Sequence, residues 1–238
     1  MNNAFAWIIF IGLIVFFIFI GIIAIVVTLL ATRDKSSSSN SNNSESYHFE
    51  TDAERYGREG ENYVSRYLKE LVYSYKGYLF NGYCFMDDDG YSSEIDHIAV
   101  TKGGIFVIET KRINGIIHGD VNSDEWIAIK DYEVSTKSFK NPVKQNQGHI
   151  NHLRRVFGSN PPKMQSIVVF VEGDISDVKS DIVTDLDGAL QIIRERTEQG
   201  KYSDAFVTNT MNRLKTITDR YGIDKEKHIQ NIKQKHQA

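Results

Sequence analysis

The chain has 238 residues, of which 41% are hydrophobic and 25% are charged, and its formal net charge is -3. This is the composition of a globular protein, and the near-neutral charge favours neither the presence nor the absence of a nucleic-acid partner. The single cysteine, Cys84, excludes a disulfide framework within the chain and fits a reducing compartment.

Residues 4–31 contain no charged side chain and are dominated by Ile, Val, Phe and Leu. About 20 apolar residues are enough for a helix to cross the hydrocarbon core of a bilayer. A secretory signal peptide would need a basic start and an apolar stretch of only about 7–15 residues. This chain begins MNNAF, without Lys or Arg, and its apolar stretch is far longer. We therefore expect a transmembrane helix over residues 4–31.

The residues after the apolar stretch predict its orientation and the domains that follow. Arg33 and Lys35 come directly after it, and no basic side chain precedes it. The positive-inside rule then predicts a single-pass protein of the cell membrane whose C-terminal domain lies in the cytoplasm. Residues 32–50 include SSSSNSNNSES and predict a flexible linker, because such a polar run cannot bury a core. We expect a globular domain over residues 51–200 and a helical extension over residues 201–238.

The first half of the globular domain is predicted to be a helix followed by strands. Over residues 53–74, Val64, Leu68 and Val72 recur at the spacing of an amphipathic helix. Short apolar segments then predict strands, which lie at residues 78–83, 94–100, 105–111, 115–121 and 126–130.

The second half is predicted to place helices around one buried strand. Asn141 as N-cap and Pro142 as the first helical residue predict a helix that ends near Phe157. The apolar run MQSIVVFVEG, residues 164–173, predicts a strand buried on both faces. A short strand, two helices and a loosely helical polar tail follow, at residues 182–183, 185–197, 203–219 and from 224 onward. This order predicts an α/β fold in which helices flank one mixed sheet.

The stretch SSEIDHIAVTKGGIFVIETKR combines two apolar strands with charges that packing does not need. TKGG is a turn signal, and pairing Thr101 with Gly104 fixes the register of the hairpin. This register sets Asp96 opposite Glu109, and opposite residues have Cβ atoms about 4.5–5.5 Å apart. Because side chains alternate along a strand, Lys111 is predicted on the same face as Glu109.

Two readings of these charges remain open from the residues alone. Adjacent carboxylates repel unless a proton or a cation lies between them, and carboxylate oxygens are ligands that Mg²⁺ and Mn²⁺ prefer. The hairpin therefore predicts a divalent metal at Asp96 and Glu109, with Lys111 beside it to polarise a water or neutralise a phosphate. The alternative is a cross-strand salt bridge from Lys111 to Asp96 or Glu94.

Further polar residues are candidates for this site or for other contacts. Glu61 falls on the buried stripe of the first helix, where an acid needs a partner, although an early-helix carboxylate is also favoured by the helix dipole. Gln145, His149 and His152 share one face of the second helix. Histidines at this spacing can converge on a second metal site, but we expect a solvated polar surface there. The tail lysines, including Lys225, are candidates for phosphate contacts.

Three motifs occur in order, and together they resemble a known family. GREGE, EIDHIAVTKGGIFVIETK and NPVKQNQGHI resemble the nuclease-related domain, NERD, over roughly residues 51–198. That family is similar to the PD-(D/E)xK superfamily of restriction-endonuclease-like nucleases, although Ile95 stands here where the superfamily name has Pro. The resemblance implies a restriction-endonuclease-like fold. It also implies a set of site residues: Asp96 and Glu109 as metal ligands, Lys111 as the catalytic lysine, Glu61 as the helical acid and Gln145 as a nearby polar group.

The resemblance also implies a function. A membrane-anchored nuclease would hydrolyse phosphodiester bonds with Mg²⁺ or Mn²⁺, a water activated near Lys111 attacking the phosphorus. The implied partner is nucleic acid, DNA in preference to RNA, and many nucleases of this superfamily act as homodimers. The alternative is a non-catalytic, membrane-tethered module that binds nucleic acid or protein, which the lack of a broad basic patch favours. A structural membrane protein that assembles with partners is a third reading.

Overall fold

The computed structural model describes residues 50–130 and 135–235, which belong to one compact unit. The transmembrane helix predicted at residues 4–31 lies outside these residues, as does the linker predicted at residues 32–50 except for its last residue. Among the helices of the described residues, none combines the length and the apolar character that a membrane span requires.

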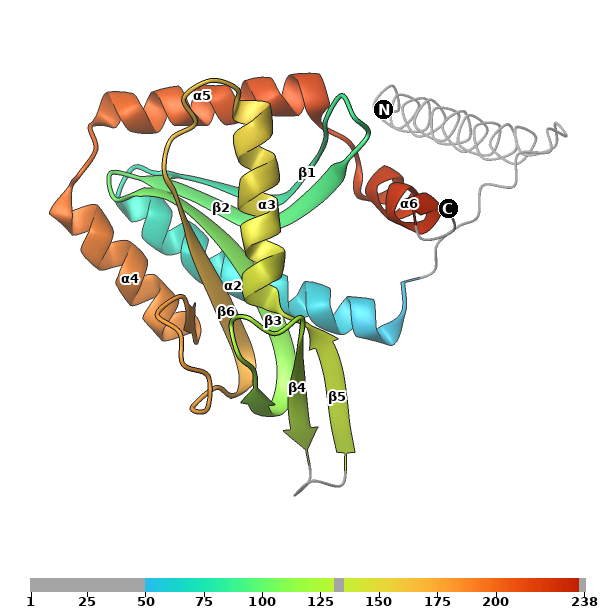
Figure 1. The fold of residues 1–238 in the computed structure, drawn as a ribbon. Helices are drawn as coiled ribbons and strands as arrows, with labels where there is room; N and C mark the ends of the chain where they lie inside the picture. Colours follow the sequence, from blue (N-terminus) through green and yellow to red (C-terminus); the bar gives the residue numbers. More distant parts are fainter. Residues whose placement is uncertain (1–49, 131–134, 236–238) are drawn as a thin grey trace, which may run out of the picture. The chain divides into compact units, whose positions relative to one another are not determined.

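The described chain runs from one helix through a series of strands to a second helix, then through two strands to the last helices, and apart from two differences among the strands this is the predicted order (Figure 1). The helices are α2 (Asp52–Ser74), α3 (Pro142–Phe157), α4 (Leu186–Gln199), α5 (Asp204–Tyr221) and α6 (Lys225–Lys235). The strands are β1 (Tyr78–Met86), β2 (Ser92–Thr101), β3 (Gly104–His118), β4 (Glu125–Lys130), β5 (Ser135–Lys140), β6 (Met164–Asp174) and β7 (Val183–Thr184).

Two strand predictions differ from the structure. The segments predicted at residues 105–111 and 115–121 are one long strand, β3, because register shifts against β6 absorb the irregular backbone around Gly115. Strand β5 was not predicted, because its sequence STKSFK is polar and almost fully exposed at the sheet edge. An edge strand with one partner can carry such residues without any apolar alternation.

The described strands form one sheet of seven strands, which is mixed as predicted. Strands β1 to β5 follow one another in antiparallel pairs, while β6 runs parallel to β3, and β7 runs parallel to β6. Residues 167–170 of β6 are buried, which confirms the prediction of a strand covered on both faces.

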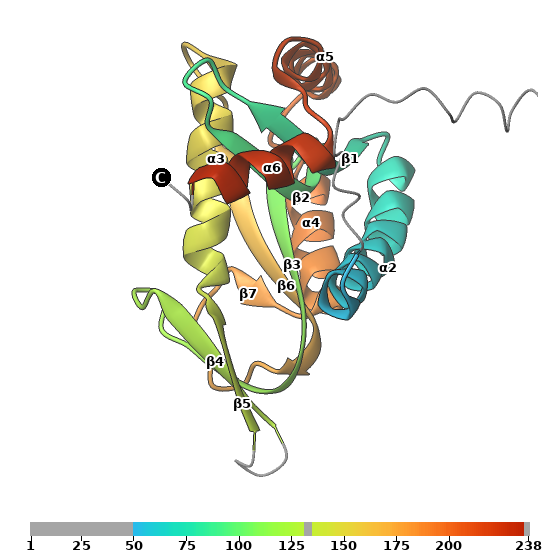
Figure 2. The ribbon, with the colours of Figure 1, turned by 90° about the vertical axis from the view of Figure 1, so that its right-hand side faces the viewer.

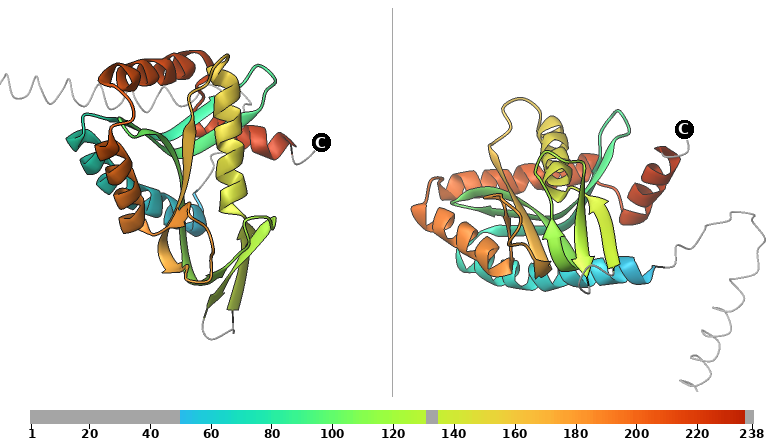
Figure 3. Two further views of the ribbon diagram at one scale, coloured as in Figure 1. Left: turned by 60° about the vertical axis from the view of Figure 1, so that its left-hand side comes forward. Right: turned by 60° about the horizontal axis from the view of Figure 1, so that its bottom comes forward.

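Helices cover both faces of this sheet (Figure 2). On one face α3 and α5 pack against β1, β2 and β3, with Ile150 and Leu214 among the buried side chains. On the other face α2 and α4 pack against β2, β3 and β6, with Leu68 and Ile193 among the buried side chains. Helix α5 runs across the C-terminal end of α3 (Figures 1 and 3). The segment predicted as an extension from residue 201 therefore shares the core of the domain.

The register predicted for the β2–β3 hairpin is confirmed, from Thr101 opposite Gly104 to His97 opposite Ile108. The ladder ends at that last pair. On the same edge of β3, pairing resumes only where Ile116 meets β4. The intervening part of β3 carries Glu109 and Lys111, so the candidate site lies where two neighbouring strands separate.

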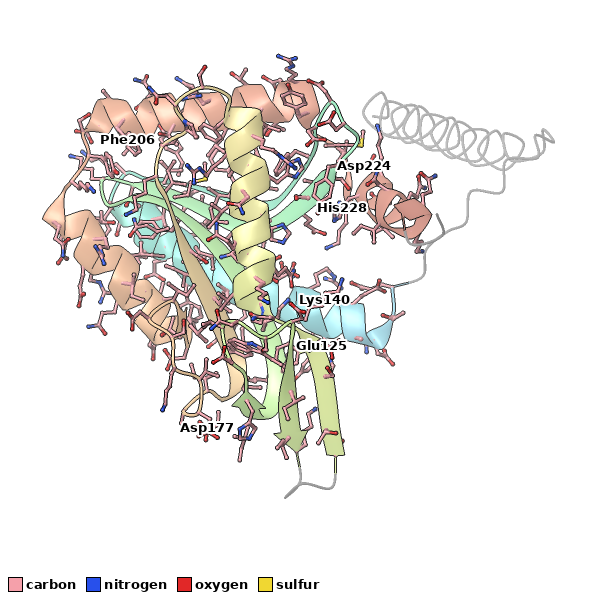
Figure 4. The ribbon with its side chains drawn as sticks, viewed as in Figure 1. Glu125, Lys140, Asp177, Phe206, Asp224 and His228 are labelled. Carbon is pink, nitrogen blue, oxygen red and sulfur yellow. The ribbon has the colours of Figure 1, made fainter. Side chains whose placement is uncertain are left out.

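The polar tail from residue 224, predicted to be loosely helical, forms helix α6, and the chain around the start of this helix is anchored on the sheet. Gly222 forms a β-bridge with Phe85, and the first turns of α6 lie against β1 and β2. Figure 4 shows His228 on α6 beside this part of the sheet, and its Nδ1 lies 2.9 Å from Oγ of Ser92. Asn231 accepts a hydrogen bond from the same hydroxyl through its Oδ1.

Candidate active site

Glu109, Lys111 and Gln145 meet between β3 and α3. Glu109 is 2% exposed, and its Oε1 accepts a hydrogen bond from Nζ of Lys111 at 2.6 Å. The same ammonium donates to Oε1 of Gln145 at 3.1 Å. Gln145 lies in the first turn of α3, whose start is set by Asn141: its side chain accepts from the N–H groups of Val143 and Lys144.

Lys111 is held charged in this environment. Burial disfavours the ammonium, but the carboxylates of Glu109, Asp96 and Glu61 outweigh this effect and raise the pKa of Lys111 above its usual value. The alternative of a cross-strand salt bridge from Lys111 to Asp96 or Glu94 is not observed. Lys111 forms an ion pair with Glu109, and Glu94 forms one with Lys225.

Asp96 would lie opposite Glu109 if the β2–β3 ladder continued by one more pair, but the ladder ends before Asp96. Its Oδ2 accepts a hydrogen bond from the backbone N–H of Thr110 at 2.7 Å. In a continued antiparallel ladder, alternation would direct that N–H to the carbonyl of Ile95. The carboxylate thus replaces a ladder bond where the strands diverge. Burial, together with the charges of Glu109 and Glu61, raises the pKa of Asp96 well above its usual value.

Glu61 reaches the same cluster from α2. Burial raises its pKa, and Glu94 and Glu109 add to this shift, while Lys225 and Lys111 oppose it. Its side chain is partly exposed, because Glu61 lines a cavity of about 400 Å³ between α2, β1, β2 and the start of α6. The first helix therefore supplies an acid to the cavity.

The cavity combines acids with flanking cations. Its lining includes Glu61, Glu94 and Asp96, together with Arg58 and Lys225. Nζ of Lys225 lies 2.7 Å from Oε1 of Glu94, and about half of the Lys225 side chain is exposed. Figure 4 shows the neighbouring Asp224 at the start of α6, close to β1. The sequence marks Lys225 only as one of several tail lysines, because its approach to Glu94 depends on the packing of α6.

His149 and His152 differ from the expectation of a solvated surface. Both are largely buried, because α3 packs against the sheet along this face. Nδ1 of His152 contacts the hydroxyl of Ser93 at 2.7 Å. Nε2 of His149 lies 3.6 Å from Oε2 of Glu109. The helical face that His149 shares with Gln145 is the sequence signal that His149 approaches the site.

The donor types at this site fit a divalent cation. Glu61 and Asp96 line the same cavity, and the charge of Glu109 adds to the shifts that raise the pKa values of both carboxyl groups. Nε2 of His149 is buried and has no hydrogen-bond partner among the residues that the structure describes. Within residues 50–130 and 135–235, however, no three acidic, histidine or cysteine side chains already converge as a complete ligand set. Residues that would hold a cation are therefore present, but their side chains are not arranged as a complete set of ligands.

Comparison with known proteins identifies the domain. Residues 56–171 match the family model of the nuclease-related domain. An uncharacterized protein of Bacillus anthracis is 35% identical over 98 residues, which cover 41% of this chain and 44% of that protein. The chain thus matches less than half the length of this relative. No solved structure matches the chain. Every candidate site residue except Lys225 falls inside the matched segment, and residues 56–171 form a NERD, or nuclease-related, domain.

Proposed function

We propose that this protein is a divalent-metal-dependent nuclease that hydrolyses phosphodiester bonds of DNA, or of RNA, at the cytoplasmic side of a membrane. The observation that carries the proposal is the Glu109–Lys111–Gln145 contact beside Asp96, inside the nuclease-related domain. The apolar stretch at residues 4–31 supports the membrane anchor. Mg²⁺ and Mn²⁺ are the proposed metals, because the donors are mainly carboxylate oxygens.

The chain's own side chains suit the steps of such a hydrolysis. Asp96 and Glu109 would hold the metal, which when bound activates a water and offsets phosphate charge. Lys111 carries a proton at Nζ and is fixed by Glu109 and Gln145. It can hold a water in line with the phosphorus or neutralise a phosphate oxygen.

Cations at the cavity rim support binding of the substrate backbone. Arg58 and Lys225 line the cavity together with the acids, and both side chains are substantially exposed. Their present partners, Glu50 and Glu94, are carboxylates that a phosphate can replace. Nucleic acid would then place one phosphate at the acids and its neighbours at these cations.

The test uses the full chain, purified in detergent, with supercoiled plasmid, linear DNA and labelled RNA in Mg²⁺ or Mn²⁺. Wild type should cleave at least one substrate, and Glu109→Gln and Lys111→Met should each lower the rate at least about a hundredfold. Glu195→Gln, which changes an exposed acid on α4, should cleave like wild type.

Two outcomes count against the proposal. Cleavage that persists in both Glu109→Gln and Lys111→Met would remove the site from the reaction. If the chain binds DNA or RNA tightly but cleaves neither with Mg²⁺ or with Mn²⁺, the result favours the alternative of a non-catalytic, membrane-tethered binding module.

A further inference from the structure

His149 approaches the one carboxylate oxygen that Lys111 leaves free. On Glu109, Oε1 contacts the Lys111 ammonium at 2.6 Å, while Oε2 faces Nε2 of His149 at 3.6 Å. His149 lies one turn after Gln145 on α3, and its side chain is 16% exposed. The two oxygens of Glu109 therefore face different groups, one supplied by the same strand and one by the helix.

The contact between His149 and Glu109 is not a hydrogen bond. A distance of 3.6 Å is too long for one, and the buried Nε2 atom has no other hydrogen-bond partner in the described residues. An imidazole nitrogen and a carboxylate oxygen at this separation can both coordinate one divalent cation that lies between them.

The spacing of the two atoms suits a shared metal ion. Imidazole nitrogen and carboxylate oxygen bind first-row divalent ions at about 2.0–2.2 Å. If the ligand–metal–ligand angle lies between about 90° and about 109°, the two ligand atoms are then roughly 3–3.6 Å apart. His149 and Glu109 already stand at the upper end of this range. A cation between them would give Nε2 the partner it lacks.

We propose that His149 is a ligand of the divalent metal and that, with Glu109, it makes the site selective for Mn²⁺ over Mg²⁺. The inference rests on the metal of the proposed function and adds a nitrogen donor to the carboxylates. Mg²⁺ prefers oxygen ligands, whereas imidazole suits the later first-row ions. Helix α3 thereby contributes to the metal site directly, in addition to positioning Lys111 through Gln145.

The test measures metal binding by the full chain in detergent, without any nucleic acid. Calorimetric titration with MnCl₂ should give a Kd at least about tenfold weaker for His149→Ala than for wild type. The Kd for MgCl₂ should change far less. His118→Ala is the matched control, because His118 pairs with Asp177 instead of with the site, and it should bind both metals like wild type.

A second measurement does not depend on whether the variant folds. Pulsed electron paramagnetic resonance of Mn²⁺ bound to wild type should detect ¹⁴N coupling from a coordinated imidazole. The proposal is overturned if that coupling is absent, if wild type binds no Mn²⁺, or if His149→Ala binds Mn²⁺ within about twofold of wild type. A chain that binds Mn²⁺ through His149 but cleaves no nucleic acid would keep this inference and reject the proposed nuclease function.

Discussion

The carboxylate of Asp96 accepts a hydrogen bond from the backbone N–H of Thr110 at 2.7 Å, directly beyond the last pair of the β2–β3 ladder. The side chain occupies the place of a backbone acceptor. It therefore holds the two strands together where they separate, and keeps an acid beside Glu109 and Glu61 at the same time.

These two roles of Asp96 can be separated by substitution. Asp96→Ala leaves the buried N–H of Thr110 without an acceptor, so the free energy of unfolding should fall by about 1–3 kcal/mol. Asp96→Asn keeps an oxygen acceptor and removes a charge that burial disfavours, so its stability should equal or exceed that of wild type. Urea unfolding at pH 7 checks both values. Equal losses for Ala and Asn would show that the hydrogen bond is not the stabilising element.

Lys111 should contribute strongly to stability through Glu109. Lys111→Met leaves a carboxylate that is 2% exposed without its ammonium, and removing one partner of a buried pair costs about 3–5 kcal/mol. The double variant Glu109→Gln/Lys111→Met should recover most of that loss, because no unpaired charge remains. Thermal and urea unfolding of the single and double variants measure the coupling, with Lys215→Met on the exposed side of α5 as control. Losses that simply add would contradict the buried pair.

Two glycines of α2 should respond in opposite ways to alanine. At Gly57 a Cβ would meet nothing within 4 Å, so Gly57→Ala should stabilise the protein by about 0.5–1 kcal/mol. At Gly60 a Cβ would lie 2.8 Å from Cβ of Arg112. Ion pairs to Glu59 and Glu172 hold that arginine in place, so Gly60→Ala should destabilise the protein. Denaturant midpoints that move in the same direction would rule out the close approach of α2 to β3.

Cys84 should react slowly with alkylating reagents in the folded protein. Burial raises the pKa of its thiol to about 12, and the thiolate is the reactive form. At pH 8 the reaction with iodoacetamide should be at least about a hundredfold slower than in denaturant. Mass spectrometry reads this cleanly because the chain has one cysteine. Similar rates in both conditions would mean that the thiol is freely exposed.

His152 should make the protein less stable as the pH falls. Burial lowers the pKa of His152, while Asp87 opposes the shift. The unfolded state then binds more protons between the lowered pKa and the usual value near 6.5. The free energy of unfolding therefore decreases as the pH falls through that window. Urea unfolding at several pH values should show a shallower decline for His152→Gln than for wild type. Parallel curves would exclude His152 as the source.

The parts of the fold that are encoded locally could be predicted. The TKGG turn determined the β2–β3 register, because pairing across a short turn leaves no freedom, and Asn141 with Pro142 determined where α3 begins. Local sequence signals could not predict that β3 is one continuous strand. Its irregular backbone is absorbed by pairing with β6, a strand that is distant in the sequence.

The sequence by itself determined the composition of the candidate site: two carboxylates and a lysine on one hairpin, an acid on the first helix and a glutamine at the start of α3. Only the tertiary structure decided which groups touch them. His149 meets Glu109 because α3 packs across the sheet, and Lys225 meets Glu94 because α6 returns to β1 and β2. Turn chemistry and periodicity describe neighbours along the chain, whereas these contacts depend on how distant elements bury their apolar faces together.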